Sequence, residues 1–249
     1  MPEGDAIHRT AERLRVLEGD VVRAESPHPR AALLRIAERI DGHRLERVEA
    51  VGKNLLLTFE DGTVVRSHLR MHGRWRVEPV GRPILGKPWL VLRGAEWQAV
   101  QHRGPVLELG PGRAERLGPD IMVAPPDLDA MLARLRAAGQ SRAVGEALLD
   151  QTLVAGIGNM WKAEALFVAG VKPWVPLREV DDERLRSVLA AAAGLMQAPR
   201  RRRGHYVYRR AGRPCGRCGT LIRSWPQGDD ARMAYWCPAC QAGTEPRGA

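Results

Sequence analysis

Residues 215–240 read CGRCGTLIRSWPQGDDARMAYWCPAC, and this stretch defines the C-terminal end of the chain. It opens and closes on a Cys-x-x-Cys pair, with eighteen residues between the inner cysteines. Two such pairs at this spacing are typical of a tetrahedral zinc site. Four thiolates leave no position for water, so the metal would be structural rather than catalytic. The sequence therefore predicts a hairpin folded around one structural Zn²⁺, with the ligands Cys215, Cys218, Cys237 and Cys240.

The cysteines and the N-terminus indicate the cellular compartment in which the protein works. The chain has four, all in its last 35 residues. A redox role for the two pairs is the alternative, but no β-α-β pattern typical of thioredoxin surrounds them. The N-terminus carries Glu3 and Asp5 where a signal peptide has basic residues, and no apolar run reaches the length of a membrane helix. We expect an intracellular protein with no membrane association.

Charge points to the class of partner. Lys and Arg number 39 against 29 Asp and Glu, which gives a formal net charge of +10. The excess is concentrated after Pro199, where eleven Arg face three acidic residues. This balance favours a polyanion such as nucleic acid, and a zinc-held hairpin could present Arg223 and Arg232 to phosphates. The alternative is an ordinary solvated surface in a protein from an arginine-rich proteome.

A glycine-rich turn, Gly156-Ile157-Gly158-Asn159, lies between two expected helices. Glycines allow the backbone to turn tightly, and free N–H groups at the start of the following helix can hold a phosphate. Taken alone, the pattern favours a simpler interpretation, a corner between two helices that Asn159 caps.

The N-terminus reads Met1-Pro2-Glu3-Gly4-Asp5. Removal of Met1, which a small second residue permits, would leave the secondary amine of Pro2 beside the carboxylate of Glu3. That pair has the composition of a nucleophile with its acid/base partner. The pKa of an α-amine is about 7.7 to 8.0, and the positive end of a helix starting near Asp5 would lower it further. The alternative is that Pro2 is only a disordered start residue.

Hydrophobic spacing predicts a β-rich first half. Ile7, Ala11, Leu14 and Leu17 predict a helix that Asp5 caps and Gly19 ends. An amphipathic helix is expected over residues 30–40. Short strands are expected over residues 45–51, 54–59, 63–68, 89–93 and 97–102, with Asp61-Gly62 as a hairpin turn. Repeated short strands of this kind indicate an antiparallel β-sandwich.

The second half is predicted to be helical. Four Pro and three Gly over residues 109–126 break both periodicities and indicate a linker. Helices are expected over residues 127–138, 142–151, 159–169 and 181–197. We therefore expect an α+β multidomain protein, with a β-sandwich flanked by helices over residues 1–124, a helical domain over 125–204 and a zinc finger over 205–249.

Three motifs together resemble the bacterial formamidopyrimidine-DNA glycosylase and endonuclease VIII family. Pro-Glu-Gly-Asp at 2–5, Gly-Ile-Gly-Asn at 156–159 and the four-cysteine finger at 215–240 occur in the family's order and approximate spacing, along nearly the whole chain. The resemblance implies an N-terminal β-sandwich, a helix-two-turn-helix domain and a zinc finger, with damaged double-stranded DNA held between the domains. It implies a DNA glycosylase of base excision repair that also cleaves abasic sites.

The same resemblance assigns roles to individual residues. Pro2 is implied to attack C1′ of the damaged nucleotide and form an iminium, with Glu3 as acid/base catalyst. Lys53 matches the family's lysine that reaches the phosphate of that nucleotide, and Asn159 and Arg232 match its other phosphate contacts. The alternative for Lys53 is an exposed lysine at the end of a strand. The iminium implies strand cleavage by β,δ-elimination.

The lesion depends on which branch the chain resembles. Residues 67–73 match the loop that fills the gap left by an everted base, and Arg70, Met71 and His72 are the expected wedge. The alternative is that Met71 packs the hairpin. The formamidopyrimidine branch has Arg-Arg-Phe-Gly where this chain reads Gln-His-Arg-Gly-Pro at 101–105, and it has a longer loop before the strand-like run Tyr206-Val207-Tyr208.

The chain thus lacks both the Arg-Arg-Phe-Gly motif and the longer loop, and these two absences favour the endonuclease VIII branch, whose substrates are oxidised pyrimidines. The alternatives are an oxidised-purine glycosylase and a DNA-binding protein without catalysis. We expect a monomer in the bacterial cytoplasm, associated with the nucleoid through DNA.

Overall fold

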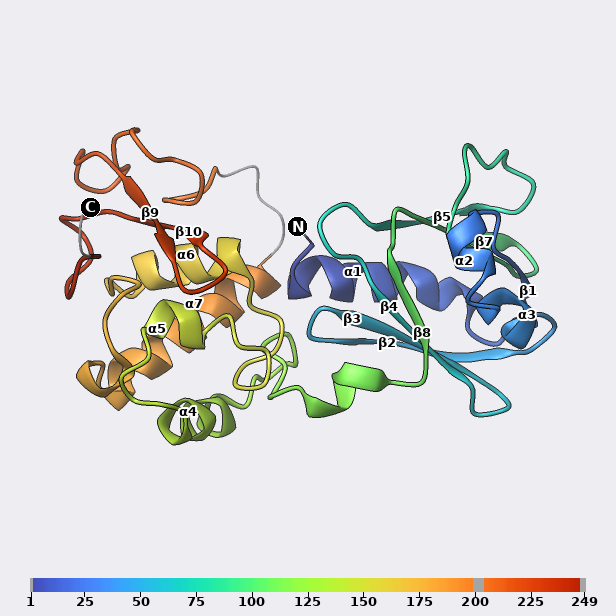
Figure 1. Ribbon diagram of the computed structural model, residues 1–249, viewed down its shortest axis with the longest axis horizontal. Helices are drawn as coiled ribbons and strands as arrows, with labels where there is room; N and C mark the ends of the chain where they lie inside the picture. The colour runs from blue at the N-terminus through green and yellow to red at the C-terminus, as the bar shows by residue number, and fades with distance from the viewer. Residues whose placement is uncertain (1, 199–203, 247–249) are drawn as a thin grey trace. The chain divides into compact units, whose positions relative to one another are not determined.

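The computed structural model describes residues 2–198 and 204–246 and consists of two compact units, Met1–Arg116 and Leu117–Ala249 (Figure 1). Met1 and part of the basic tail, residues 199–203, lie outside the described residues. The second unit begins ahead of the domain limit expected at residue 124. The reason is packing: the Gly118 N–H donates to the Gln151 carbonyl, and Ile121 is fully buried in the core of the second unit.

The first unit consists of two four-stranded antiparallel sheets, with the strand orders β2-β3-β4-β8 and β1-β6-β7-β5. The strands are β1 (Arg23–Glu25), β2 (Leu45–Val51), β3 (Asn54–Phe59), β4 (Val64–His68), β5 (Arg74–Pro79), β6 (Leu90–Arg93), β7 (Trp97–His102) and β8 (Val106–Leu109). The helical segments are α1 (Gly4–Leu14), η1 (Arg15–Leu17), α2 (Pro29–Ala32), α3 (Ile36–Ile40) and η2 (Gly112–Arg116).

Side chains of both sheets share one core. Leu55 and Leu57 of β3 and Leu90 and Leu92 of β6 are fully buried in it, and α1 and η1 add the apolar residues whose spacing predicted a helix here. Burial of each such leucine contributes roughly 1.5–3 kcal/mol to folding. The expected β-sandwich flanked by helices is confirmed.

The sequence predicted the four central strands and the edge strand β2 but missed β1, β5 and β8. Each of the three lies at an edge of its sheet. Edge strands carry charged residues that keep them from pairing with other chains, which weakens the apolar alternation that identifies a strand. In β5 this is visible in Arg74 and Arg76, which are exposed on either side of the buried Trp75.

Two local predictions in this unit were wrong. The helix expected over residues 30–40 is broken into α2 and α3, because Arg35 adopts the left-handed conformation with φ 53°. Asp5 does not cap α1: the cap position is Glu3, without a side-chain cap bond. Asp5 instead lies buried in the first turn and pairs with Arg9 at 2.6 Å. Asp61-Gly62 does form the β3–β4 turn, with φ 78° at Gly62.

The second unit contains the helical domain and the finger. Its elements are α4 (Leu128–Ala137), α5 (Val144–Ala147), α6 (Asn159–Val168), η3 (Leu177–Glu179), α7 (Asp182–Gln197), β9 (Arg223–Gln227) and β10 (Arg232–Trp236). Three of the four expected helices match α4, α6 and α7 closely, whereas α5 is a single turn because the chain after it folds into the loop that ends at Gly158.

The finger is the smaller part of this unit. Strands β9 and β10 form an antiparallel hairpin, and Phe167 of α6 packs with Val207, Ile222 and Cys237. The strand-like run at 206–208 is not a strand but a turn whose backbone is bonded to α6. Over the described residues, no helix is long and apolar enough to cross a membrane.

Candidate functional site

The N-terminus of the first unit is anchored at the start of α1. The carbonyl of Glu3 accepts hydrogen bonds from the N–H groups of Ala6 at 2.9 Å and Ile7 at 3.1 Å. Glu3 is only 3% exposed, and Pro2 before it is half-buried. The backbone beside Pro2 is therefore fixed at the positive end of the helix dipole, where a protonated amine is disfavoured.

Lys53 lies in the turn between β2 and β3. Val51 and Asn54 are paired across the hairpin, so that Gly52 and Lys53 form a two-residue turn. Gly52 has φ 59°, a conformation that favours glycine at the first position of such a turn. Lys53 is 8% exposed, so the exposed strand-end alternative does not describe it.

A buried arginine supports this turn, and sequence reasoning missed it. Arg66 of β4 donates from Nη1 to Asn54 Oδ1 at 2.6 Å and from Nη2 to Glu108 Oε2 at 2.6 Å. Asn54 in turn donates to the Val51 carbonyl at 3.3 Å. Arg66 is 6% exposed and Asn54 5%. The residue that follows Lys53 is thus held by a network across three strands.

His68, at the end of β4, lies in a strongly positive environment. The pKa of His68 is lowered to about 4, first by burial and then by the positive charges of Arg70, Arg66 and Lys53. The backbone N–H of Arg70 donates to Nδ1 at 3.1 Å, so that Nε2 carries the proton of the neutral ring. A neutral imidazole can donate one N–H to a phosphate oxygen without adding charge. His68 belongs to the segment 67–73 that the sequence analysis identified as a loop, but its lowered pKa could not be predicted there, because its charged neighbours are brought together by the pairing of strands.

The expected wedge residues lie together in the loop after His68. Arg70, Met71 and His72 are all exposed, and Met71 is 56% exposed, which does not fit the alternative that it packs the hairpin. The loop is tight: the Gly73 N–H donates to the Leu69 carbonyl at 2.8 Å. A Cβ on Gly73 would lie 2.5 Å from that carbonyl oxygen, so glycine is required here.

A second loop lies directly against the wedge loop. The Cβ built on Gly73 would also lie 3.0 Å from the carbonyl oxygen of Arg103. Beneath the two loops, Ser67 accepts hydrogen bonds from Trp75 Nε1 at 3.2 Å and Gln101 Nε2 at 2.6 Å. These three buried residues join β4, β5 and β7 and fix the loops that follow them.

In the second unit, the glycine-rich turn leads into α6. Gly156 has φ 99°, and its N–H donates to Gln151 Oε1 at 3.1 Å. The cap of α6 is Gly158, so the alternative in which Asn159 caps the helix is wrong. Asn159 is the first helical residue, and its Nδ2 donates to the Met233 carbonyl at 2.9 Å. Because Met233 follows Arg232 in β10, this bond connects two of the expected phosphate contacts.

Helix α6 also holds other parts of the finger. The carboxylate of Glu164 accepts from the backbone N–H groups of Tyr206, Val207 and Tyr208 at 2.7–3.0 Å. Fully buried Lys162 lies 3.3 Å from Gln227, the residue paired with Arg232 across the hairpin. Sequence reasoning missed both residues. The available signal was a pair of charged residues inside an otherwise apolar helix.

Arg232 lies at the start of β10, with 41% of its side chain exposed. Its Nη2 and Nε approach one carboxylate oxygen of Asp230 at 3.0 and 3.2 Å. The guanidinium is accessible but already has an anionic partner within its own hairpin.

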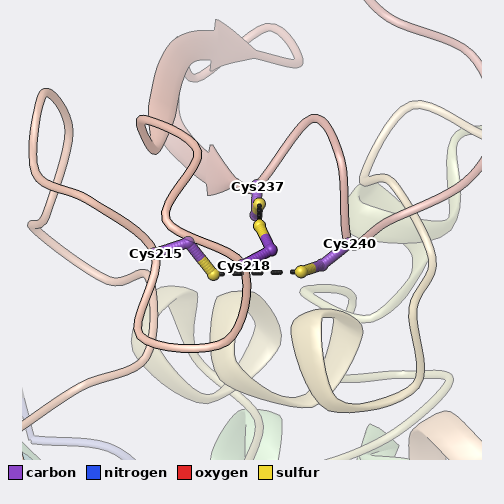
Figure 2. A group of neighbouring side chains, drawn as sticks. All are labelled: Cys215, Cys218, Cys237 and Cys240. Carbon is purple, nitrogen blue, oxygen red and sulfur yellow. Dashed lines mark hydrogen bonds between the residues drawn. The ribbon is translucent and has the colours of Figure 1, made fainter.

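The four cysteines converge as the sequence predicted. Figure 2 shows Cys215 and Cys218 facing Cys237 and Cys240, with Sγ–Sγ distances of 3.9 Å for Cys215 to Cys240 and 3.5 Å for Cys218 to Cys237. All four sulfurs lie within 4.8 Å of one another. Thiolates about 2.3 Å from a tetrahedral zinc ion would be about 3.8 Å apart. The donor set and its spacing therefore fit Zn²⁺, and four sulfurs close the coordination shell.

The predicted residues fall into two groups. Pro2, Glu3, Lys53 and the wedge loop belong to the first unit, whereas Asn159, Arg232 and the cysteines belong to the second. Within the first group, burial and the charges of Arg70 and Lys53 lower the pKa of the neighbouring His68. Within the second, the Met233 carbonyl links Asn159 to the strand of Arg232.

Comparison with known families covers both units. The model described as the formamidopyrimidine-DNA glycosylase N-terminal domain matches residues 1–118, and the one described as the formamidopyrimidine-DNA glycosylase H2TH domain matches residues 117–207. The probable endonuclease 8 2 of Streptomyces coelicolor is 41% identical, with 99% of this chain and 96% of that protein aligned. The DNA-(apurinic or apyrimidinic site) lyase Nei2 of Mycolicibacterium smegmatis is 33% identical, with 97% and 99% aligned.

Solved structures agree on the fold. Fpg (MutM) from Lactococcus lactis, in complex with DNA containing an oxidised pyrimidine, superposes with a TM-score of 0.82 over 97% of this chain and 100% of that one, at 22% identity. A structure of MutM in complex with DNA containing carbocyclic 8-oxo-G gives a TM-score of 0.80 over 97% of this chain and 100% of that chain, also at 22% identity.

Proposed function

The chain belongs to the formamidopyrimidine-DNA glycosylase family, within the endonuclease 8 and Fpg group of base-excision-repair glycosylases, and from this we propose that it removes an oxidised base and then cleaves the abasic site. The observation that carries the proposal is the N-terminal geometry: Glu3 is buried at the cap position of α1, directly after Pro2. Once Met1 is removed, the nitrogen of Pro2 becomes a secondary amine at a fixed position beside a carboxylate.

The proposed chemistry begins with this amine. The Pro2 nitrogen attacks C1′ of the everted nucleotide, the C1′–N bond to the base breaks, and the base leaves with the bonding electrons and takes up a proton. Loss of the amine proton and opening of the sugar ring give an iminium. Glu3 moves protons at the sugar. Removal of a C2′ proton then expels the 3′ phosphate, and a second elimination expels the 5′ phosphate.

Four side chains are proposed to hold the DNA backbone. Lys53 and the neutral His68 would donate to phosphates from the first unit, and Asn159 and Arg232 from the second. Asn159 has a second amide hydrogen for this purpose, because only one is needed for the Met233 carbonyl. Such contacts position the DNA and do not select the lesion.

Oxidised pyrimidines are the proposed substrates. The support is the similarity to relatives named endonuclease 8, together with the exposed wedge loop and the lack of phenylalanine over residues 101–105. Met71, with Arg70 and His72 beside it, would fill the gap left by the everted base. An oxidised-purine glycosylase shares the chemistry and differs at these loops.

The metal is proposed to be one structural zinc ion. Cys215, Cys218, Cys237 and Cys240 would bind it and join the two turns of the finger. When bound, it supplies folding free energy rather than a reactive water, because its four ligands are all thiolates. The protein is proposed to act as a monomer.

Borohydride trapping tests the catalytic proposal. Zinc-loaded protein whose mass confirms the loss of Met1 should form a reduced covalent adduct with a duplex containing an abasic site, and peptide mapping should place it on Pro2. A Glu3→Gln variant should bind the duplex but give much less product. Binding without any adduct on abasic or oxidised-pyrimidine DNA would refute catalysis and leave a DNA-binding protein. A clear preference for 8-oxoguanine over dihydrothymine would refute the pyrimidine assignment.

A further inference from the structure

The tip of the finger hairpin contains an ion pair that opposes the proposed role of Arg232. Its Nη2 and Nε lie 3.0 and 3.2 Å from the same Oδ2 atom of Asp230. These two nitrogens form one edge of the guanidinium group, and such an edge is what arginine offers to a phosphate for two parallel hydrogen bonds. The edge is therefore occupied by a carboxylate of the same chain.

The backbone of the tip brings the two side chains together. Residues 228–231 form the loop between Gln227 and Arg232, which are paired across the hairpin. The Ala231 N–H closes this loop on the Gly228 carbonyl at 3.0 Å. Ala231, between Asp230 and Arg232, has φ 47°, a conformation that residues with a Cβ rarely adopt. The turn at Ala231 allows residues 230 and 232 to face each other.

The surroundings of Arg232 are acidic in an otherwise basic segment. Only three acidic residues follow Pro199 in the sequence, and Asp229 and Asp230 are two of them. A surface pocket of about 290 Å³ beside Arg232 is lined by both and by Glu146 of α5, while the second arginine of its lining, Arg142, is paired with Asp150 at 2.8 Å. A DNA phosphate that approaches Arg232 must therefore enter a region where carboxylates are already concentrated.

We propose that Asp230 competes with DNA phosphate for Arg232 and thereby sets the affinity of the finger for DNA. In this proposal, which rests on the proposed phosphate contact of Arg232, binding is an exchange: the carboxylate leaves Nε and Nη2 and a phosphate takes its place. The pair is exposed, with 41% of the Arg232 side chain and 74% of the Asp230 side chain accessible, so the exchange is open to solvent and reversible. Asp230 thus limits binding without blocking it.

The chain offers a matched control. Asp229→Asn changes the net charge by the same amount as Asp230→Asn, one residue away, but of the two carboxylates it is Asp230 that pairs with Arg232. Binding of zinc-loaded protein to a fluorescein-labelled, undamaged duplex can be measured by polarisation over a series of salt concentrations. Since exposed ion pairs contribute little, we expect Asp230→Asn to tighten binding about three- to fivefold at low salt. Asp229→Asn should change it by less than about twofold, because a charge without direct contact is screened.

The same comparison in an Arg232→Ala background completes the test. In that background, Asp230→Asn and Asp229→Asn should have the same effect on DNA affinity, because the guanidinium group for which Asp230 and phosphate compete is absent. If wild-type protein binds the duplex more tightly than Arg232→Ala, but Asp230→Asn binds no more tightly than Asp229→Asn, the competition is refuted and the phosphate contact stands. Weaker binding by Asp230→Asn would mean that Asp230 orients Arg232, which also overturns the proposal. If wild type and Arg232→Ala bind equally, or neither binds, the phosphate contact itself fails and the competition with it. Unchanged zinc content and melting temperature would verify that each variant is folded.

Discussion

Two hairpins present the basic residues proposed to hold DNA, and they are stabilised in different ways. The β2–β3 turn with Lys53 belongs to a sandwich with a large apolar core, and the buried pair Arg66 and Asn54 fixes it. The β9–β10 hairpin with Arg232 is two-stranded, and such a hairpin is marginally stable alone. It depends on the cysteine cluster and on side chains of α6. Lys53 is buried in a turn of the sandwich, whereas the position of Arg232 depends on contacts that can be removed one at a time.

Metal removal should give the largest difference in stability between the two hairpins. Binding of structural zinc in finger peptides is worth on the order of 10–16 kcal/mol. A Cys237→Ser variant, or chelation of the wild type, should therefore unfold the finger and weaken DNA binding at least as much as Arg232→Ala does, because the Arg232 contact is lost. The first unit should keep its thermal transition. Metal analysis, binding and calorimetry measure this, and full DNA affinity after verified metal loss would contradict the comparison.

Loss of the buried arginine should affect only the other hairpin. In Arg66→Met the carbonyl oxygen of the Asn54 side chain would lose its partner at 2.6 Å. A buried polar group without a partner costs about 1–3 kcal/mol. The free energy of unfolding of the first unit should fall by that amount, as measured by urea titration, while zinc content stays unchanged. Arg66→Lys, which keeps the charge but not the planar geometry, should recover only part of it.

Arg232→Ala should weaken DNA binding without destabilising either unit. Removal of one phosphate contact should weaken binding to about the same degree for every DNA sequence and lower the slope of log K against log salt by about one. Since Arg232 is exposed, the melting temperature should not change. An unaltered salt slope would show that Arg232 does not contact a phosphate.

The lowered pKa of His68 should make the stability of the first unit depend weakly on pH. Its pKa is lowered to about 4, mainly by burial, while the unfolded chain titrates near the ordinary value of 6.5. Between these two values the unfolded state binds more protons, so stability should fall as the pH falls through this range. The limiting slope is about 1.4 kcal/mol per pH unit, and solvent screening of the half-exposed ring reduces it. His68→Gln should remove this part of the pH dependence, and equal slopes in both proteins would contradict it.

Sequence reasoning identified the parts of this protein that depend on local pattern. The bounds of β2, β3 and β7 match the expected strands, and the cysteine spacing predicted the cluster of four sulfurs that the fold brings together. The network of Arg66 could not be predicted, because it connects residues 12 and 42 positions apart whose proximity depends on strand register. The pKa of His68 is hidden for the same reason, since three basic residues meet only in the folded sheet.

The start of the second unit shows another limit. Prolines and glycines over residues 109–126 indicated a linker, but the fully buried Ile121 anchors the later part of that segment in a core. The content of proline and glycine predicts where the chain turns, but it does not predict which residues the turns bury. The ion pair of Asp230 and Arg232 was equally hidden, because residues two apart meet here only through the left-handed Ala231.

The attachment of the finger to α6 has a consequence for how this protein can change over evolutionary time. Asn159 bonds to the carbonyl of residue 233, and Glu164 bonds to the N–H groups of residues 206–208. Each recognises main chain, which every residue supplies, except that proline has no N–H to offer at 206–208. These bonds therefore do not depend on the side chain of the exposed Met233, whereas the buried Val207 is also constrained by its packing against Phe167. Sequence variation at this junction would accumulate most readily at the exposed positions of the finger.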